Sequence, residues 1–401
     1  MKRKINFLLI SIFIFGGLVF FVTKNYSFAR ETGKKIVIGD SVKIKSKVLN
    51  EERELFIYLP EGYHQSKEKY PVLYKLDGHL GFKYTTGIID HFQHFGRMPQ
   101  MILIGVLNTD RNRDFTPTKY NIPTGGGADN FLKFMKDELI PFIDKNYRTQ
   151  PYRILSGHSL CGMFAIYALL VQPNLFSAYI ATSPSLWWDG RTVLKKAEGI
   201  FDKQSNLKKF LFINFGGGDS EHIKASTWAF AQLLERKAPQ DLEWKVVFSE
   251  KEDHVTIPIL SFPDGLEVLY KDWEVPGDVL TKGVEALQVH FKLLSKKFGY
   301  EIPVAESAYN KLGYKLMNEG KLEEALDIFK LNVKLHPDSW NVYDSLGEAY
   351  MKSSNKELAI KNYKKSLELN PLNHNAFGML NRLKEKNESV LPSLETTLVN
   401  I

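Results

Sequence analysis

The stretch "RILSGHSLCGMFAIYAL", residues 153–169, places two side chains of nucleophile type, Ser159 and Cys161, close together. It runs from an apolar, strand-like segment through a tight turn into an apolar segment of helical length. A serine attacks an ester efficiently only when a base removes its proton and hydrogen-bond donors await the oxyanion, which requires an exposed position on a sharp turn. We therefore expect Ser159 on a strand-to-helix turn, with the amide of Leu160 as one oxyanion donor.

Cys161 stands where the pattern G-x-S-x-G has its last glycine. Cysteine is a small residue and is among the most frequently buried types. A reactive thiol, by contrast, needs partial exposure and a cationic neighbour. We therefore predict that Cys161 packs between helix and sheet and that Ser159 is the nucleophile.

An acid and then a histidine should follow an elbow serine along the chain, each on a loop after a later strand. The segment "KKFLFINFGGGDSEH" supplies Asp219 and Glu221, and "WKVVFSEKEDHVTIP" supplies His254. We predict His254 as the general base. Asp219 is preferred as its orienting acid because it lies three residues beyond Gly216, where the strand should end, and Glu221 is the alternative.

Two further segments are expected at the same edge of the sheet. "PVLYKLDGHLGF" offers the amide of Gly78 or His79 as the second oxyanion donor, although a plain Asp-Gly turn would look the same. "SPSLWWDG" offers Trp187, with its neighbour Trp188, as an apolar wall for the substrate or as core.

Arg111 and Arg113 in "NTDRNRDFTPT" follow another apolar strand-like segment. An arginine fork there would hold a carboxylate or catecholate of the substrate. Alternatively, one of the two pairs with Asp110 or Asp114 and is structural.

Several classes of function find no support. The sequence has no H-E-x-x-H, no paired CxxC and no Walker-type glycine loop, so we expect neither a metal nor another cofactor. Beyond residues 1–29 the chain carries 49 basic and 46 acidic residues, so its high isoelectric point does not indicate nucleic-acid binding. The single cysteine excludes an internal disulfide.

Residues 1–29 are predicted to be an export signal. Three basic residues precede an uncharged apolar segment over 5–22, and Ala29 offers a small residue for cleavage. The apolar segment is just long enough to span a bilayer, so cleavage and retention as a membrane anchor are both open. In either case the body of the protein is expected outside the cytoplasm, periplasmic or secreted.

Residues 36–273 alternate short apolar segments with longer amphipathic ones, which predicts an α/β domain with a mostly parallel sheet flanked by helices. Seven strands are expected, together with a helix in "DNFLKFMKDELIPFIDKNY" whose N-cap would be Asp129. Residues 274–300 are expected to contain a connecting helix.

Residues 301–385 show a helical repeat with a period of 34. Leu312-Gly313 recurs as Leu346-Gly347, and Phe329 recurs as Tyr363. This period predicts tetratricopeptide repeats, which are pairs of helices whose small residues permit close packing. A third copy is incomplete and leads into a tail over 386–401.

Together the quoted segments, with "RILSGHSLCGMFAIYALLVQPNLFSAYIATSPSLWWD" and "EDHVTIP", resemble the "Putative esterase" family of α/β-hydrolases over about residues 38–272. The resemblance implies an α/β-hydrolase fold and a triad of Ser159, His254 and an acid. Within that family the chain is most similar to the siderophore esterases and their tetratricopeptide-fused bacterial relatives. The substrate does not carry over, because family members cleave chemically different esters.

The sequence thus predicts an exported serine carboxylic ester hydrolase that forms an acyl-enzyme with a small-molecule ester. The rival hypothesis is a non-catalytic binding protein whose repeats recruit a protein partner. The complete order of serine, acid and histidine favours the enzyme, because a scaffold has no need of that series.

Overall fold

The computed structural model describes residues 36–388, and eight strands form one sheet in the order β1-β2-β4-β3-β5-β6-β7-β8. The strands are β1 (Asp40–Ser46), β2 (Glu51–Tyr58), β3 (Tyr70–Lys75), β4 (Ile102–Val106), β5 (Thr149–His158), β6 (Ala178–Thr182), β7 (Lys209–Gly216) and β8 (Leu242–Ser249). Pairing is antiparallel from β1 to β2 and from β2 to β4, and parallel between all other neighbours. The predicted mostly parallel sheet is confirmed.

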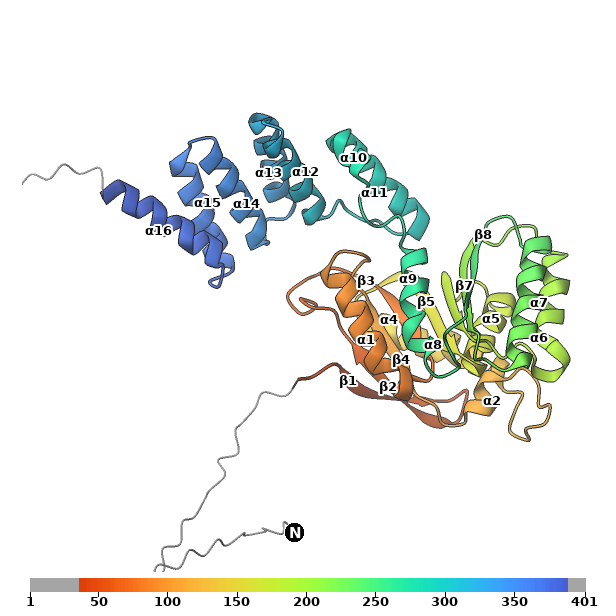
Figure 1. The fold of residues 1–401 in the computed structure, drawn as a ribbon. Coiled ribbons are helices and arrows are strands. Elements are labelled where there is room, and N and C mark those ends of the chain that lie inside the picture. Colours follow the sequence, from red (N-terminus) through yellow and green to blue (C-terminus); the bar gives the residue numbers. More distant parts are fainter. Residues whose placement is uncertain (1–35, 389–401) are drawn as a thin grey trace, which may run out of the picture. The chain divides into compact units, whose positions relative to one another are not determined.

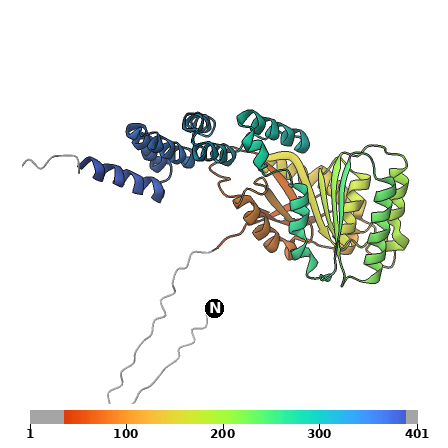
Figure 2. The same cartoon turned by 45° about the horizontal axis from the view of Figure 1, so that its top comes forward.

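Helices cover the sheet on both faces, as Figures 1 and 2 show, with α1 and α9 on one side and α5, α6 and α7 on the other. Strands β3, β4 and β6 are buried along their whole length. Continuous apolar sequence is typical of strands buried on both faces, which is why these segments were recognisable. Strand β1 was not predicted, because its exposed face is polar and only two of its residues are buried.

The helices of this domain are α1 (Gly78–His94), α2 (Arg111–Phe115), α3 (Ala128–Phe134), the π-helical turn η1 (Met135–Leu139), α4 (Ile140–Asn146), α5 (Leu160–Val171), α6 (Trp188–Phe201), α7 (Glu221–Lys237), α8 (Ile257–Leu260) and α9 (Phe262–Leu269). The prediction of Asp129 as an N-cap is wrong. Gly127 is the N-cap of α3, and the Asp129 carboxylate accepts a hydrogen bond from the Tyr167 hydroxyl at 2.7 Å. The residue type suited a cap, but a partner from α5 engages the side chain instead.

The remaining helices are α10 (Gly277–Thr281), α11 (Val284–Phe298), α12 (Glu306–Asn318), α13 (Leu322–Leu335), α14 (Trp340–Lys352), α15 (Lys356–Leu369) and α16 (His374–Glu388). In the two repeats, a β-carbon on Gly313 would lie 2.6 Å from the ring of Phe329, and one on Gly347 would lie 2.9 Å from the ring of Tyr363. The 34-residue recurrence thus preserves one contact, in which a glycine of the first helix receives an aromatic ring of the second.

Two predictions concern segments at the chain ends. Residues 1–29, predicted as signal or anchor, and most of the predicted tail lie outside the described residues. Among the helices within 36–388, none combines the length and apolar character that crossing a bilayer requires.

The Gly313 contact yields a stability prediction. Gly313→Ala is expected to weaken the packing of α12 on α13 by about 1–3 kcal/mol, because the added methyl group overlaps the Phe329 ring. The measurement is amide hydrogen exchange of these two helices in the full chain. Gly378→Ala in α16 is the matched control, since nothing lies within 4 Å of the added atom there. Equal exchange in both variants would contradict the packing role.

Candidate active site

Ser159 occupies the sharp turn between β5 and α5, with a backbone φ of 61° and ψ of −117°. A positive φ is unfavourable for a residue with a side chain, and such strain is characteristic of a nucleophile elbow. The amide of Ser159 donates to the carbonyl of Thr182 at 2.9 Å, and the amide of Ser185 donates to the carbonyl of Ser159 at 3.1 Å. Hydrogen bonds to the last residue of β6 and to the segment that follows it therefore hold both the amide and the carbonyl of the strained residue.

Close packing at the start of α5 depends on Gly162 rather than on position 161. A β-carbon at Gly162 would lie 2.9 Å from the carbonyl oxygen of Thr182. Cys161 is fully buried, and burial together with nearby Asp77 raises the pKa of its thiol well above the ordinary value. Both observations agree with the packing interpretation of Cys161, because a neutral, inaccessible thiol is a poor nucleophile.

The structure brings Asp219 and His254 together. Asp219 follows β7, His254 follows β8, and the Nδ1 atom of His254 lies 2.5 Å from the Oδ1 atom of Asp219. The other carboxylate oxygen accepts from the Ser183 hydroxyl at 2.5 Å and from the Gly216 amide at 2.7 Å. The acid is thus fixed by three partners.

The same contacts set the charge of Asp219. Burial alone would raise its pKa, but the hydrogen bonds from His254, Ser183 and the Gly216 amide outweigh burial and hold the pKa below its ordinary value. Asp219 is therefore ionised at neutral pH. A buried carboxylate on Nδ1 fixes the ring so that Nε2 remains for proton transfer.

Two acids close in sequence to the pair, Glu221 and Asp253, are engaged elsewhere. Glu221 is the first residue of α7, and its side chain is 86% exposed and paired with Lys224 at 2.6 Å. Asp253 is exposed, and its carboxylate accepts from the amides of Val255 and Thr256, both at 2.8 Å. Asp253 therefore stabilises the turn that carries His254.

His254 lies beside the elbow, with its ring centroid 4.3 Å from that of His158. Burial and nearby His254 and Lys75 lower the pKa of His158 to about 3, so this neighbour is neutral. Within the described residues, the hydrogen-bond partner of Ser159 Oγ is Ser185 Oγ, at 3.3 Å. Hydrogen bonds between nucleophile and base often tighten only when substrate is bound.

The predicted oxyanion donors lie at two helix starts. Leu160 is the first residue of α5, and Gly78 is the first residue of α1, followed by exposed His79. The first amides of a helix have no acceptor within the helix and are available to an anion. Both helices start at the carboxyl ends of neighbouring strands, β5 and β3.

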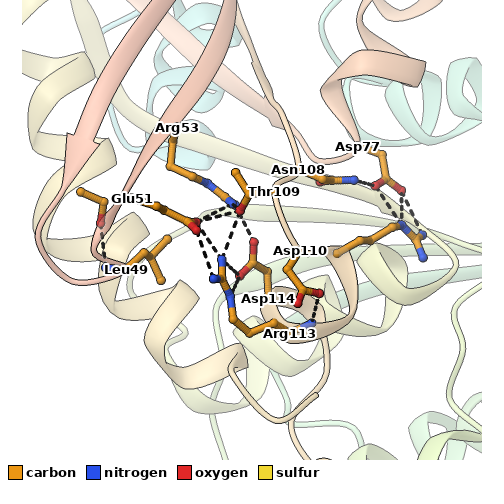
Figure 3. Close-up of polar contacts among 11 residues, drawn as sticks. Leu49, Glu51, Arg53, Asp77, Asn108, Thr109, Asp110, Arg113 and Asp114 are labelled. Carbon is orange, nitrogen blue, oxygen red and sulfur yellow. Dashed lines mark hydrogen bonds and ion pairs between the residues drawn. The ribbon is translucent and has the colours of Figure 1, made fainter. Parts of the chain in front are cut away.

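The two arginines have different partners. Figure 3 shows Arg113 in a cluster with Glu51, Arg53 and Asp114, and shows Asp77 with Asn108 in a second group. Arg113 donates to Asp114 at 2.8 Å and to Glu51 at 2.7 Å. Arg113 therefore pairs with Asp114, as the alternative hypothesis of a structural arginine predicted.

Arg111 belongs to the second group. It is part of a bidentate ion pair with Asp77, from Nε to Oδ1 at 2.9 Å and from Nη2 to Oδ2 at 3.0 Å. Contact of Arg111 or Arg113 with substrate stays a prediction.

Trp187 and Trp188 differ in burial. Trp188 is 3% exposed, and its indole donates to the Thr118 hydroxyl at 3.0 Å, so it belongs to the core. Trp187 is partly exposed, with its ring centroid 6.3 Å from that of His222. It is two residues from Ser185, which contacts Ser159, and this placement is compatible with a substrate wall.

Sequence reasoning missed Ser183 and Ser185, which support the acid and the nucleophile. A signal was present, since both lie within three residues of the end of β6, and β6 is the neighbour of β5, the strand that Ser159 follows. The ion pair of Asp77 with Arg111 was also missed, because the segment around Asp77 was considered only for its backbone amides and as a turn. In the part of the chain that is described, no group of three or more His, Cys, Asp or Glu side chains could hold a metal ion.

Comparisons with known proteins place the chain in a family. A model described as "Putative esterase" matches residues 46–266, and a "Tetratricopeptide repeat" model matches residues 341–371. Ferri-bacillibactin esterase BesA of Bacillus subtilis is 27% identical over 254 residues, which are 55% of this chain and 86% of that protein. Siderophore triacetylfusarinine C esterase of Aspergillus fumigatus is 27% identical over 242 residues, which are 51% of this chain and 82% of that protein.

A solved structure supports the same placement. An IroE-like serine hydrolase from Shewanella oneidensis is similar with a TM-score of 0.66 and 29% identity, over 74% of this chain and 99% of that one. The fold is that of an α/β-hydrolase followed by tetratricopeptide repeats. The chain belongs to the putative esterase family of α/β-hydrolases, a family of carboxylic ester hydrolases.

Proposed function

We propose that the protein hydrolyses a carboxylic ester through an acyl-enzyme formed on Ser159. The observation that carries this proposal is the contact of 2.5 Å between His254 and the buried, ionised Asp219, beside the strained elbow at Ser159. A histidine held by a buried carboxylate next to an elbow serine is the arrangement that activates a hydroxyl for acyl transfer.

Each residue has one role in this mechanism. Ser159 Oγ attacks the ester carbonyl while His254 Nε2 takes its proton, and Asp219 stabilises the imidazolium that forms. The amides of Leu160 and of Gly78 or His79 donate to the oxyanion. His254 then protonates the leaving alkoxide, and a water molecule activated by the same histidine hydrolyses the acyl-enzyme.

The proposed substrate is an ester of the siderophore type. Two relatives are named as a ferri-bacillibactin esterase and a siderophore triacetylfusarinine C esterase. Trp187, partly exposed near Ser185, would supply an apolar wall for an aromatic or acyl group. The rival hypothesis of a non-catalytic scaffold does not account for the contact between Asp219 and His254.

We further propose that the protein acts outside the cytoplasm. The basic residues and apolar segment within residues 1–29 support export. The repeats are proposed to offer a surface to a protein partner, as helical repeats commonly do.

The nucleophile is tested by peptide mass mapping after treatment with a fluorophosphonate. We expect the adduct on Ser159, because this serine combines the strained elbow with a neighbouring histidine. Ser159→Ala is expected to lower kcat by about 10³-fold or more. A folded protein that forms no adduct, or a Ser159→Ala variant with nearly full activity, would refute the mechanism.

The acid is tested by comparing two isosteric changes. Asp219→Asn is expected to lower kcat by about 10³- to 10⁴-fold, because the amide no longer stabilises the imidazolium and favours the wrong tautomer. Glu221→Gln is the control and is expected to retain the wild-type kcat, since its side chain is exposed and directed to Lys224. Loss of activity in the Glu221 variant alone would reverse the assignment.

The packing role of Cys161 predicts its reactivity. The thiol is expected to resist iodoacetamide in the native protein and to be alkylated after unfolding in guanidinium, because it is fully buried and its pKa is raised. Mass spectrometry of the two samples measures this. Rapid alkylation of the native protein, with loss of activity, would assign chemistry to the thiol.

A further inference from the structure

Asp77 connects the end of β3 to the first turn of α1, and its backbone is left-handed, with φ 53° and ψ 44°. Residues with a β-carbon rarely adopt this region, so neighbouring contacts must hold it. Although Asp77 occupies the N-cap position, its carboxylate does not cap its own helix. The side chain is therefore directed away from α1, toward the loop that follows β4.

Arg111 is the main partner of that carboxylate. Its guanidinium donates from Nε to both oxygens, at 2.9 and 3.1 Å, and from Nη2 at 3.0 Å, and the Asn108 amide also donates. Asp77 is only 6% exposed. Burial alone would raise its pKa, but the contacts with Arg111 and Asn108 outweigh burial and keep the pKa low. Both partners are thus charged at neutral pH.

The same guanidinium reaches the nucleophile elbow. Nη2 of Arg111 lies 3.3 Å from the carbonyl oxygen of His158, the residue before Ser159. Arg111 therefore joins three loops that follow the adjacent strands β4, β3 and β5. One of these loops contains the nucleophile, and another contains the amides of Gly78 and His79.

Gly78 itself is confined. A β-carbon there would lie 2.6 Å from the carbonyl carbon of Gly105 in β4, so the turn is pressed against the neighbouring strand. With its backbone packed on one side and Asp77 held on the other, the turn has little freedom to move. The direction of the Gly78 and His79 amides then depends on the ion pair between Asp77 and Arg111, because Asp77 immediately precedes them.

We propose that Arg111 is a positioning residue, which fixes the oxyanion-binding turn at Gly78 and His79 relative to the elbow at Ser159 through its ion pair with Asp77 and its hydrogen bond to His158. The inference rests on the acyl-enzyme function proposed above. It differs from a substrate fork, because the Nε and Nη2 edge of the guanidinium is bound to a buried carboxylate of the protein; a substrate contact through Nη1 is the competing role that the experiment below separates from positioning.

The test compares two esters on the full chain, neutral p-nitrophenyl butyrate and the singly charged mono-p-nitrophenyl ester of succinate. Arg111→Lys and Arg111→Gln are expected to lower kcat about 10- to 100-fold on both esters, with KM within about threefold, because an oxyanion donor is displaced. An increase of KM confined to the anionic ester would overturn the proposal and identify Arg111 as a substrate contact.

Hydrogen exchange of the segment 76–82 provides a readout that does not need activity. Exchange is expected to be faster in Arg111→Gln and in Asp77→Asn. It should not change in the control Arg153→Gln, whose partner Asp144, at 2.7 Å, lies outside the site. Unchanged exchange in Arg111→Gln would overturn the proposal.

The two proposals fail separately. If the wild-type protein cleaves neither ester and forms no fluorophosphonate adduct, the catalytic function fails, and the exchange rates alone decide the role of Arg111. If Arg111→Gln does not fold, Arg111→Lys and Asp77→Asn, which nearly preserve side-chain volume, supply the same comparison.

Discussion

The strained, positive-φ backbone of Ser159 is the constraint on which the rest of the site depends. A residue with a side chain in this conformation costs of the order of 1–3 kcal/mol, which surrounding contacts must offset. The Thr182 carbonyl and the Ser185 amide supply two of these contacts. Both belong to the segment around the end of β6, so the elbow requires β5 and β6 to pair in register. The parallel sheet is in this sense part of the active site.

The acid and the base depend on the next pair of strands. After β7, the amide of Gly217 donates to the carbonyl of Ser249 at the end of β8, at 3.0 Å, and the amide of Gly218 donates to the carbonyl of Glu252 in the following loop, at 2.9 Å. These backbone hydrogen bonds hold the two loops together without any contribution from side chains. Asp219 and His254 lie in contact because the backbones of their two loops are hydrogen-bonded to each other. The Ser183 hydroxyl, just after the end of β6, also donates a hydrogen bond to Asp219.

Much of this could be predicted from the sequence, because strand ends and their order are local signals. Ser159, Asp219 and His254 each follow a recognisable apolar segment, and parallel strands deliver such residues to one edge of the sheet. Which arginine meets which carboxylate could not be predicted. Asp77 is 34 residues from Arg111, and Glu51 is 62 residues from Arg113, so these pairings are set by the tertiary fold alone. For the same reason Asp129 was misassigned, since the competing hydroxyl belongs to α5.

The cluster beside Arg113 has a consequence for how the sequence can vary. Arg53 and Asp114 are 61 residues apart in the chain, lie 2.6 Å from each other and are almost completely buried. Removing one member of an isolated buried pair costs about 3–5 kcal/mol, whereas replacing both by apolar residues of similar volume is often neutral. Here Arg53 also pairs with Glu51, and Asp114 also pairs with Arg113, so a single change leaves a buried charge with one partner fewer and is expected to cost less than that. A change at one of the two positions is therefore expected to be less well tolerated than a joint change. Among relatives, these two positions should covary: a chain that retains the arginine should retain the aspartate, and a chain that loses one should have lost both.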